Sequence, residues 1–455
     1  MTEPQTAEVP DVLLREFASV VGEAHVLTGE ATAGYAVDWT GGFRGHTPAV
    51  LRPGSTAEVA TLLALCSDAE VPVVPQGGNT GLVGGGVPLH GEVVLSLARL
   101  AELGPVDADA AQVTAGAGVT LQQVADAGPA LDLGVLNASR GRATVGGAIA
   151  TNAGGLRVLR YGPMRAQVRG VEAVLSDGTI VSHLSGLVKD NTGYDYPGLL
   201  AGSEGTLAVI TAARLQLVPR PADPVTVIIG LADLSEVHGV ARRALREVPG
   251  LLSAEFFTRT GLDVLAEHAD LVPPLQAEVY LLLEAAGPGA IEDLAALAGN
   301  MPVAVGLTAA DRARLWAYRE RHPEAAGFLG VPLKLDVSVP AARWVTLATE
   351  IGGVVRSVDP GAQVIIYGHV ADGNLHVNVV PVAEADGRHE DAVFGFVASL
   401  GGSISAEHGI GALKARWLPL VRSEAERALF ARIRSAFDPD GILNPHVLPR
   451  WQGEQ

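Results

Sequence analysis

The amino-acid sequence predicts an α+β protein with two main domains, and three observations support this prediction. Short β-branched runs in the first half of the chain surround two glycine-rich clusters, at 77–86 and 141–155. Three prolines within 219–224 form a stiff link, because a proline ring fixes its own backbone angle φ. Beyond this link, strand-like and helix-like segments alternate, a pattern that can build one sheet covered by helices on one face.

The expected domains correspond to these changes along the chain. Residues 1–45 are expected to form a helical lead-in, because Val12–Val21 carries apolar residues at helical spacing. The remaining boundaries place a first domain at 46–221, a second at 222–410 and a C-terminal helical segment at 411–455.

Local signals place the individual elements. Ser55 is a suitable N-cap for a helix at Thr56–Ala69, and Asp177-Gly178 is typical of a hairpin turn. Helices of roughly ten to fifteen residues are expected between most strands of the second domain. Strands are predicted at Ala49–Arg52, Val71–Pro75, Glu92–Ser96, Gln112–Ala115, Val168–Ser176, Thr179–His183, Val225–Gly230, Leu252–Phe257, Glu278–Glu284, Met301–Val305, Lys334–Val339 and Gln363–His369.

The composition excludes several classes of protein. A length of 455 residues suits two or three domains with a large core. The net charge of −18 disfavours binding to nucleic acid, whose phosphates need a basic surface. Cys66 is the only cysteine, which rules out an intramolecular disulfide framework and fits a reducing compartment. The sequence shows no secretory leader and no apolar run of ~18 residues, so we expect a cytoplasmic protein, with peripheral contact to a membrane left open.

The two glycine clusters indicate a binding site. Six of the ten residues at 77–86 are glycine, so successive backbone N–H groups can turn toward one point and bind a phosphate. Two extended clusters in one domain favour this interpretation over simple tight turns. Neither cluster is a Walker A loop or a convincing G-x-G-x-x-G turn, so no NAD site is expected.

The pair of loops resembles the FAD-binding domain shared by vanillyl-alcohol oxidase and p-cresol methylhydroxylase (PCMH). Within that superfamily, the chain is similar from about Ala49 to Pro445 to the D-lactate, glycolate and D-2-hydroxyglutarate dehydrogenases. Further matches are Gly202–Leu207, Val209–Thr211 and Leu443–Pro445. The resemblance implies a two-subdomain PCMH-type FAD-binding domain, an α/β substrate (cap) domain with an antiparallel sheet, and a C-terminal helical segment that returns to the FAD domain.

The resemblance also implies which residues bind FAD. Asn79 stands near the place where some relatives carry a histidine linked to the flavin, so we expect non-covalent FAD. Ala208 replaces a common glycine, and His446-Val447 replaces the usual Gly-Lys after Asn444-Pro445. The expected cofactor-binding residues are Pro75, Gln76, Gly77, Gly78, Asn79, Thr80, Gly81, Gly84, Gly85, Gly141, Thr144, Gly146, Gly147, Thr151, Asn152, Gly154, Gly155, Glu204, Ile210 and Asn444.

A set of histidines and a glutamate indicates chemistry in the second domain. A turn at Asp372-Gly373 would place His369 and His376 opposite each other across a hairpin. With Glu407 they would suit Zn²⁺ or a similar ion, although two histidines seven residues apart are often surface or core filler. The resemblance implies His369, His376 and Glu407 as metal ligands and His408 as the base that takes the substrate's hydroxyl proton.

The favoured substrate is a dicarboxylic D-2-hydroxy acid. The D-2-hydroxyglutarate dehydrogenases carry an arginine and a lysine at the separation of Arg319 and Lys334, where these residues hold the distal carboxylate. Lys334 could instead form a salt bridge with Asp336. Asn378 shares a strand face with His376 and is a further substrate-binding candidate. In that subfamily, a hydroxyl residue that contacts the substrate often stands at the position of Pro323. The choice between D-2-hydroxyglutarate and D-malate therefore stays open.

Other functions and partners remain open at this point. The alternatives are a D-lactate or glycolate dehydrogenase subunit and an oxidase that reduces O₂. A non-enzymatic flavin-binding regulator is disfavoured, because it needs no base beside a metal. We expect a separate electron acceptor, namely a quinone, an electron-transfer flavoprotein or a cytochrome, and a homodimer is possible.

Overall fold

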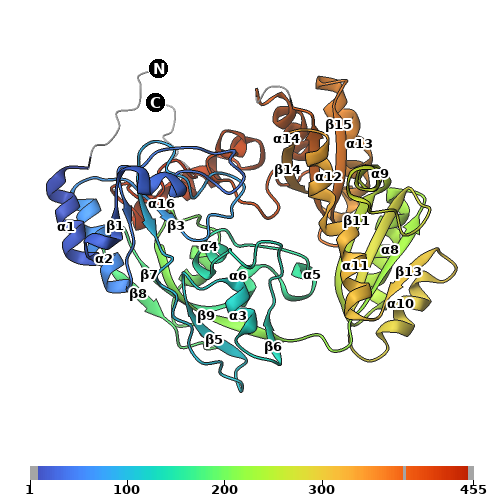
Figure 1. Cartoon of the computed structure of the whole chain (residues 1–455), viewed down its shortest axis with the longest axis horizontal. Helices are drawn as coiled ribbons and strands as arrows, with labels where there is room; N and C mark the ends of the chain where they lie inside the picture. Colours follow the sequence, from blue (N-terminus) through green and yellow to red (C-terminus); the bar gives the residue numbers. More distant parts are fainter. Residues whose placement is uncertain (1–8, 383–385, 449–455) are drawn as a thin grey trace.

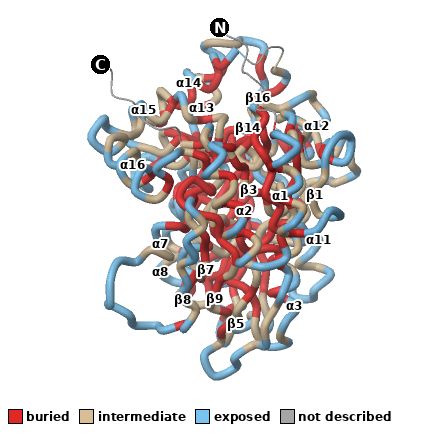
Figure 2. The backbone as a smooth tube through the Cα atoms, turned by 90° about the vertical axis from the view of Figure 1, so that its left-hand side faces the viewer, coloured by how far each residue is buried: buried red, intermediate tan, exposed pale blue. Residues whose placement is uncertain are grey.

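The computed structural model describes residues 9–382 and 386–448, which form two lobes (Figure 1). One lobe contains the N-terminal half of the chain together with the C-terminal helix α16 (Glu424–Phe437). The other lobe contains the alternating strands and helices that follow the proline-rich link. The buried backbone is concentrated in the strands at the centre of the molecule, and the loops around them are exposed (Figure 2). The α+β class predicted from the sequence is confirmed.

A four-stranded sheet begins the first lobe. Helices α1 (Asp11–Val21) and α2 (Thr56–Asp68) pack against it through a core that includes Phe17 and Leu62. The side chain of Ser55 accepts a hydrogen bond from the backbone N–H of Glu58, as predicted for an N-cap. The lead-in also supplies a strand that joins this sheet. The strand order is β1 (Val26–Leu27), β2 (Val50–Leu51), β4 (Val93–Ser96) and β3 (Val73–Gln76).

A second sheet completes the glycine-rich domain. Its longest strand, β9 (Val209–Pro219), was not predicted, although it pairs with three other strands of the sheet. Helix α4 (Val145–Ala150) lies within the second glycine cluster. The hairpin at Asp177-Gly178 is confirmed. The other elements are β5 (Gln112–Gly116), α3 (Leu121–Asp126), β6 (Leu131–Leu133), α5 (Val158–Tyr161), α6 (Met164–Gln167), β7 (Val168–Val174), β8 (Ile180–His183) and α7 (Tyr196–Leu200).

The second lobe contains a seven-stranded antiparallel sheet, as the family resemblance implied. We refer to this lobe as the cap. Its strands, in the order in which they pair, are β13 (Val303–Gly306), β10 (Val225–Leu231), β12 (Val279–Ala285), β11 (Leu251–Thr258), β15 (Gln363–His369), β16 (Asn374–Val380) and β14 (Leu333–Ser338).

Helices cover both faces of the cap sheet, so the expectation of helices on one face is wrong. Phe256 packs into one apolar cluster and its neighbour Phe257 into the other. Every residue of β12 is buried and most of them are apolar, so the strand is covered on both sides, which explains its lack of polar alternation. One face carries α8 (Leu234–Glu247), α10 (Ala290–Ala298), α13 (Trp344–Val358) and α14 (Arg388–Ser399); the other carries α9 (Arg259–Ala269), α11 (Ala309–Glu320) and α12 (His322–Phe328).

The C-terminal segment returns to the first lobe, as expected. After α15 (Leu418–Val421) and α16, the chain runs beside β3, and Leu443 forms a parallel bridge with Val73. The N–H of Val73 donates to the carbonyl of Ile442 at 2.8 Å, and the N–H of Asn444 donates to the carbonyl of Val73 at 2.8 Å. Leu443 is fully buried, so residues 442–443 complete the first core.

We predict that Leu443→Ala destabilises the protein by about 2–5 kcal/mol, the usual effect of truncating a fully buried leucine. Leu420→Ala is the matched control, because Leu420 lies in the same segment and is 46% exposed. The control is expected to change stability by no more than about 0.5 kcal/mol. Urea denaturation followed by tryptophan fluorescence measures both variants. Equal midpoints for the two variants would contradict the role given to Leu443.

Candidate active site

A cavity of about 360 Å³ lies between the two glycine loops. Most of the predicted cofactor residues line it, whereas Gly141, Asn152, Gly155 and Asn444 do not. Those that line it are Pro75, Gln76, Gly77, Gly78, Asn79, Thr80, Gly81, Gly84, Gly85, Thr144, Gly146, Gly147, Thr151, Gly154, Glu204 and Ile210.

The glycines allow the two loops to touch each other. A Cβ on Gly78 would lie 2.0 Å from the carbonyl oxygen of Arg142, and one on Gly77 would lie 2.3 Å from the Oγ1 of Thr144. Any side chain at Gly77 or Gly78 would overlap the opposite loop, so the packing of the two loops requires glycine at both positions. The loops therefore build the cavity as a pair.

The lining suits FAD. Exposed backbone along Gly77–Gly81 can bind a pyrophosphate, since glycine leaves N–H groups accessible. Ala208, Val209 and Ile210 provide an aliphatic wall suited to a flat ring. The residues present thus offer both kinds of contact that a flavin dinucleotide requires.

Three predicted cofactor residues hold the walls of this cavity. The amide of Asn444 donates to the carbonyls of Gly85 and Glu204, at 2.8 and 2.9 Å. The carboxylate of Glu204 accepts the N–H groups of Ile410 and Gly411, each at 2.8 Å. Asn152 accepts the N–H of Arg165 at 2.9 Å. These side chains stabilise backbone around the cavity.

The sequence analysis missed lining residues that come from irregular segments. Asp38 and Trp39 belong to the lead-in, and the indole N–H of Trp39 donates to the carbonyl of Thr80 at 3.0 Å. Asn137, Ala138 and Ser139 precede the second loop. None of these residues lies in a motif, so no sequence signal pointed to them.

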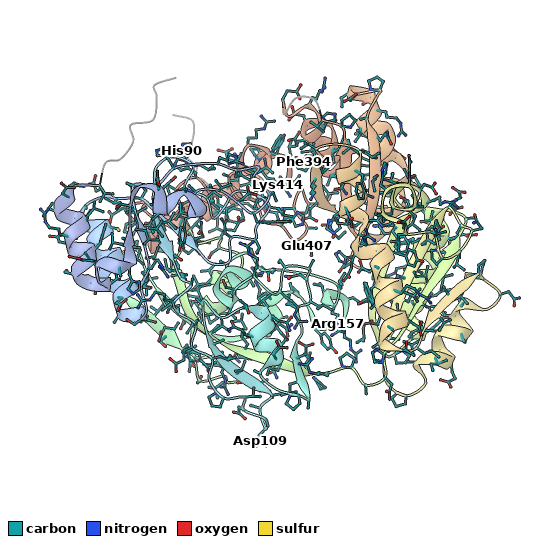
Figure 3. All side chains as sticks on the ribbon, viewed as in Figure 1. His90, Asp109, Arg157, Phe394, Glu407 and Lys414 are labelled. Carbon is teal, nitrogen blue, oxygen red and sulfur yellow. The ribbon has the colours of Figure 1, made fainter. Side chains whose placement is uncertain are left out.

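Glu407 and His408 line the same cavity, and Glu407 lies between the two lobes (Figure 3). A Cβ on Gly154, in the second glycine loop, would lie 2.6 Å from Oε2 of Glu407. The glycine cavity and the predicted metal site are therefore contiguous.

The β15–β16 hairpin brings the two predicted histidines to Glu407. Oε1 of Glu407 lies 3.6 Å from Nε2 of His369 and 3.5 Å from Nε2 of His376. Ligand atoms about 2.1 Å from a tetrahedral ion are ~3.4 Å apart, so this spacing suits a metal centre. Both imidazole nitrogens therefore face the same carboxylate oxygen, and imidazole with carboxylate is a donor set that suits Zn²⁺.

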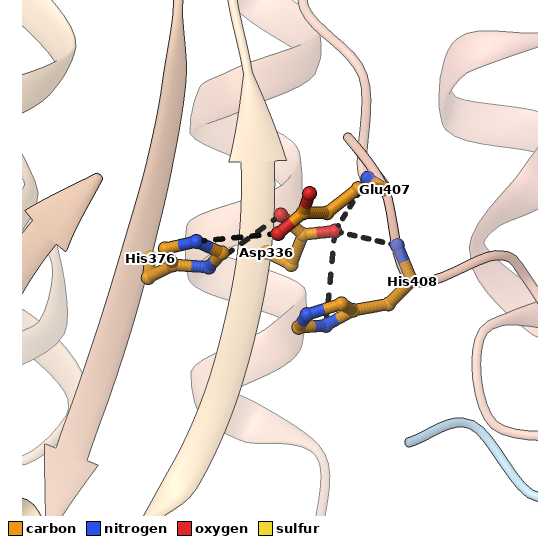
Figure 4. A group of neighbouring side chains, drawn as sticks. All are labelled: Asp336, His376, Glu407 and His408. Carbon is orange, nitrogen blue, oxygen red and sulfur yellow. Dashed lines mark hydrogen bonds and ion pairs between the residues drawn. The ribbon is translucent and has the colours of Figure 1, made fainter. Parts of the chain in front are cut away.

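A second grouping of possible ligands shares two of these residues. Asp336, His376, Glu407 and His408 have facing atoms within 4.8 Å of one another (Figure 4). However, Oδ2 of Asp336 accepts the N–H groups of residues 406, 407 and 408 at 2.8–3.1 Å, and Oδ1 accepts the amide of Asn374 at 2.7 Å. Because these donors occupy its oxygens, we favour Asp336 as a structural carboxylate and His369 as the third ligand candidate.

The electrostatics of the cluster favour ionised carboxylates. Burial would raise the pKa of Glu407, but the hydrogen bond and charge of His369 lower it to about 2. Burial would lower the pKa of His369, yet Glu255 and Glu407 raise it well above its usual value. For His376 burial dominates and lowers the pKa to about 3. Without a metal, the arrangement therefore pairs a cationic His369 with an anionic Glu407.

The predicted substrate cations have different surroundings. Arg319 is buried, and its Nε and Nη2 contact Oε2 of Glu255 at 2.9 and 2.8 Å. Its guanidinium also lies 4.6 Å from the centre of the Tyr367 ring. Lys334 is exposed and opposes Asn378 across β14 and β16. Among the described contacts no ion pair joins Lys334 to Asp336, so that alternative is not formed.

Comparison with known proteins identifies the family. Residues 220–448 match the model of the FAD-linked oxidase C-terminal domain, and residues 47–183 match an FAD-binding domain. The chain is 37% identical over 431 residues to the mitochondrial D-2-hydroxyglutarate dehydrogenase of Rattus norvegicus, covering 90% of this chain and 79% of the relative. The enzyme of that name from Bos taurus is 38% identical, covering 90% and 78%. The chain belongs to the FAD-linked oxidase family.

The fold agrees with this membership. The structure of p-cresol methylhydroxylase with bound substrate superposes with a TM-score of 0.77, at 15% identity, covering 96% of each chain. The family resemblance drawn from the two glycine loops is confirmed by the matching family models and relatives. The chain is an FAD-linked oxidoreductase, as predicted, with a PCMH-type fold.

Within this family, one departure has a clear structural partner. The imidazole of His446 lies 3.2 Å from the carboxylate of Glu92, and its ring centre lies 3.7 Å from that of His90, with the two rings tilted. Neither His446 nor its buried neighbour Val447 lines the cavity. Ala208, the other departure, is accommodated in the cavity wall.

The expectation of a cytoplasmic protein is wrong on this comparison. The rat and cattle relatives are both named as mitochondrial. The expectation relied on a missing secretory leader and on a single cysteine, and neither observation separates one reducing compartment from another. In the described residues, no helix combines the length and the apolar character needed to cross a bilayer.

We predict that Gly78→Ala weakens FAD binding about 5- to 150-fold, because overlap with the opposite loop costs on the order of 1–3 kcal/mol. Gly141→Ala is the control, since a Cβ there meets nothing within 4 Å and the residue does not line the cavity. The ratio of flavin to protein absorbance after gel filtration measures both variants. Full flavin retention by Gly78→Ala would show that the loops do not need this contact.

Proposed function

We propose that this chain oxidises a D-2-hydroxy acid to the 2-oxo acid, with FAD and a divalent metal ion, Zn²⁺ first among the candidates. The observation that carries the proposal is the continuity of the two sites: Glu407 and His408 line the cavity built by the glycine loops. An alcohol held at the histidine–glutamate cluster would thus lie beside the cofactor. His369, His376 and Glu407 would hold the metal.

His408 is the proposed base. Its Nδ1 lies 3.7 Å from Oδ2 of Asp336, beyond hydrogen-bond distance, so this carboxylate favours a proton on Nδ1 through its charge alone. Nε2 then has a free lone pair that can take the hydroxyl proton of the substrate. When bound, the flavin accepts a hydride and the metal ion lowers the pKa of a coordinated hydroxyl.

A dicarboxylic substrate, D-2-hydroxyglutarate or D-malate, is favoured. Glu255 contacts the Nε and Nη2 of Arg319, so Nη1 remains for a substrate carboxylate. Lys334 and Asn378 lie opposite each other on adjacent strands and can act together on the same group. The names of the rat and cattle relatives support this choice.

D-lactate or glycolate is the second candidate. The charge of Arg319 is already balanced by the buried carboxylate of Glu255, which weakens its attraction for a second carboxylate on the substrate. This ion pair supports a monocarboxylic substrate more strongly than the sequence pattern alone does.

Two further parts of the proposal are that FAD is bound without a covalent link and that a separate acceptor takes up its electrons. The amide of Asn79 donates to the carbonyl of Val37 at 2.9 Å, and His408 is the one histidine among the lining residues, which supports non-covalent FAD. A quinone, an electron-transfer flavoprotein or a cytochrome would reoxidise the flavin.

Anaerobic titration of the purified protein with D-2-hydroxyglutarate, D-malate and D-lactate tests the substrate class. We predict that a dicarboxylic acid bleaches the flavin absorbance. His408→Asn should slow this reduction by about 10²–10⁴-fold, the usual contribution of a positioned base, while leaving FAD bound. His268→Asn, on the outer helix α9, is the control and should reduce at the normal rate. Unchanged reduction in His408→Asn would remove the base from the proposal.

Removal of metal provides an independent test. Dialysis against a chelator is expected to abolish flavin reduction by the hydroxy acid and to leave the flavin spectrum intact, because the proposed ligands lie outside the glycine loops. Addition of Zn²⁺ should restore the activity. Full activity in a preparation shown by elemental analysis to hold no metal would disprove metal assistance.

A further inference from the structure

Glu255 lies behind the histidine–glutamate cluster on β11 and is 1% exposed. No sequence motif contains it, and it lies 114 residues from His369. We propose that Glu255 is a positioning residue that fixes the metal ligand His369 and the substrate-binding Arg319 relative to each other. This inference rests on the function proposed above.

The two oxygens of Glu255 have separate partners. Oε1 lies 2.7 Å from Nδ1 of His369, and Oε2 lies 2.8–2.9 Å from Nη2 and Nε of Arg319. All three residues are buried, with exposed fractions of 1–6%. A buried carboxylate with both oxygens paired has little freedom to move, so it acts as a rigid link between its two partners.

The contact with His369 determines which nitrogen faces the metal. A carboxylate at Nδ1 accepts the N–H there, so in the neutral imidazole that would bind a metal the lone pair of Nε2 would lie on the side of Glu407. Such outer carboxylates orient a ligating imidazole and make it a better donor. Glu255 therefore prepares His369 for a divalent ion.

The contact with Arg319 sets the direction of the guanidinium. Because that group is planar, holding Nε and Nη2 on one oxygen fixes the plane and the direction of Nη1. Tyr367 supports the same plane from its face, with a 4.6 Å approach. One carboxylate thus fixes the distance between the point where the substrate's hydroxyl binds and the point where its carboxylate binds.

Loss of an ion pair with a purely structural role would leave Zn²⁺ affinity and KM unchanged. The chain offers a matched comparison for this case. Glu284 lies on the adjacent strand β12, is also buried, and contacts Arg157 at 3.4 Å, Trp316 at 2.8 Å and Thr226 at 3.2 Å. None of these partners belongs to the histidine–glutamate cluster. Glu284→Gln therefore controls for the loss of a buried charge in the same sheet.

The test compares Glu255→Gln and Glu284→Gln with the unaltered holoenzyme. We expect Glu255→Gln to bind Zn²⁺ 10–100-fold more weakly in competition with a chromophoric chelator, the usual effect of losing an outer partner. The visible band of the Co²⁺-substituted protein should shift, and the KM for the hydroxy acid should rise. Flavin content should stay normal. Glu284→Gln should match the unaltered protein in all four measurements.

A second variant keeps the inference testable if Glu255→Gln does not fold. Arg319→Met removes the other arm of the link without touching a metal ligand. If Glu255 connects the two groups, this change alters Zn²⁺ affinity and the Co²⁺ band as well as KM. Unchanged Zn²⁺ affinity in both Glu255→Gln and Arg319→Met, or in Arg319→Met alone if the first variant is insoluble, would overturn the inference.

The outcomes separate this inference from the proposed function. If the unaltered protein reduces its flavin with a D-2-hydroxy acid and Glu255→Gln retains Zn²⁺ normally, only the role of Glu255 fails. If no such acid reduces the flavin while Glu255→Gln still loses Zn²⁺, the proposed substrate fails and the positioning of His369 stands.

Discussion

The position of the catalytic candidates depends on how one short loop, residues 405–411, is held between two buried carboxylates. Asp336 of the cap accepts the N–H groups of residues 406–408, and Glu204 of the FAD-binding lobe accepts those of residues 410 and 411. Buried N–H groups left without acceptors would be costly, so both carboxylates have to be in place for the loop to adopt this shape. The charge of Lys414 acts on both carboxylates: together with His408 it lowers the pKa of Asp336, whereas burial still leaves the pKa of Glu204 raised. Through this loop, Glu407 and His408 keep a fixed relation to the flavin cavity.

Most of the fold could be predicted, because short apolar runs, N-caps and turn residues act locally. The failures came from tertiary context. Strand β9 was missed because its first residues, Val209–Thr211, were read only as a family motif, although the alternation of Arg214 and Gln216 with buried apolar residues is typical of a strand. The cap sheet was assigned helices on one face, although the nearly continuous apolar run of β12 already indicated burial on both faces. Helix α4 was hidden by its glycines, which disfavour helix in isolation but are stabilised by packing against β9 and β5.

The candidate site likewise contains residues that the sequence predicted and residues that only the folded structure reveals. Residues in contiguous motifs, such as the glycine loops and the His-Glu set, could be named from the sequence. Asp336 was considered only as a partner for Lys334, and Glu255 was not considered, because each acts on residues about 70 or 114 positions away. Two buried carboxylates, in different strands of one sheet, thus orient two imidazoles of the candidate active site, and this arrangement is visible only once the chain is folded.

The pairing of Leu443 with Val73 has a consequence for biosynthesis. A domain made of contiguous sequence can fold while the ribosome is still translating the downstream part of the chain. The FAD-binding lobe lacks this option, since its first sheet gains an edge from residues 442–444 after more than 350 intervening residues have been made. The edge of this sheet at β3 must therefore stay without these partners until residues 442–444 have been made.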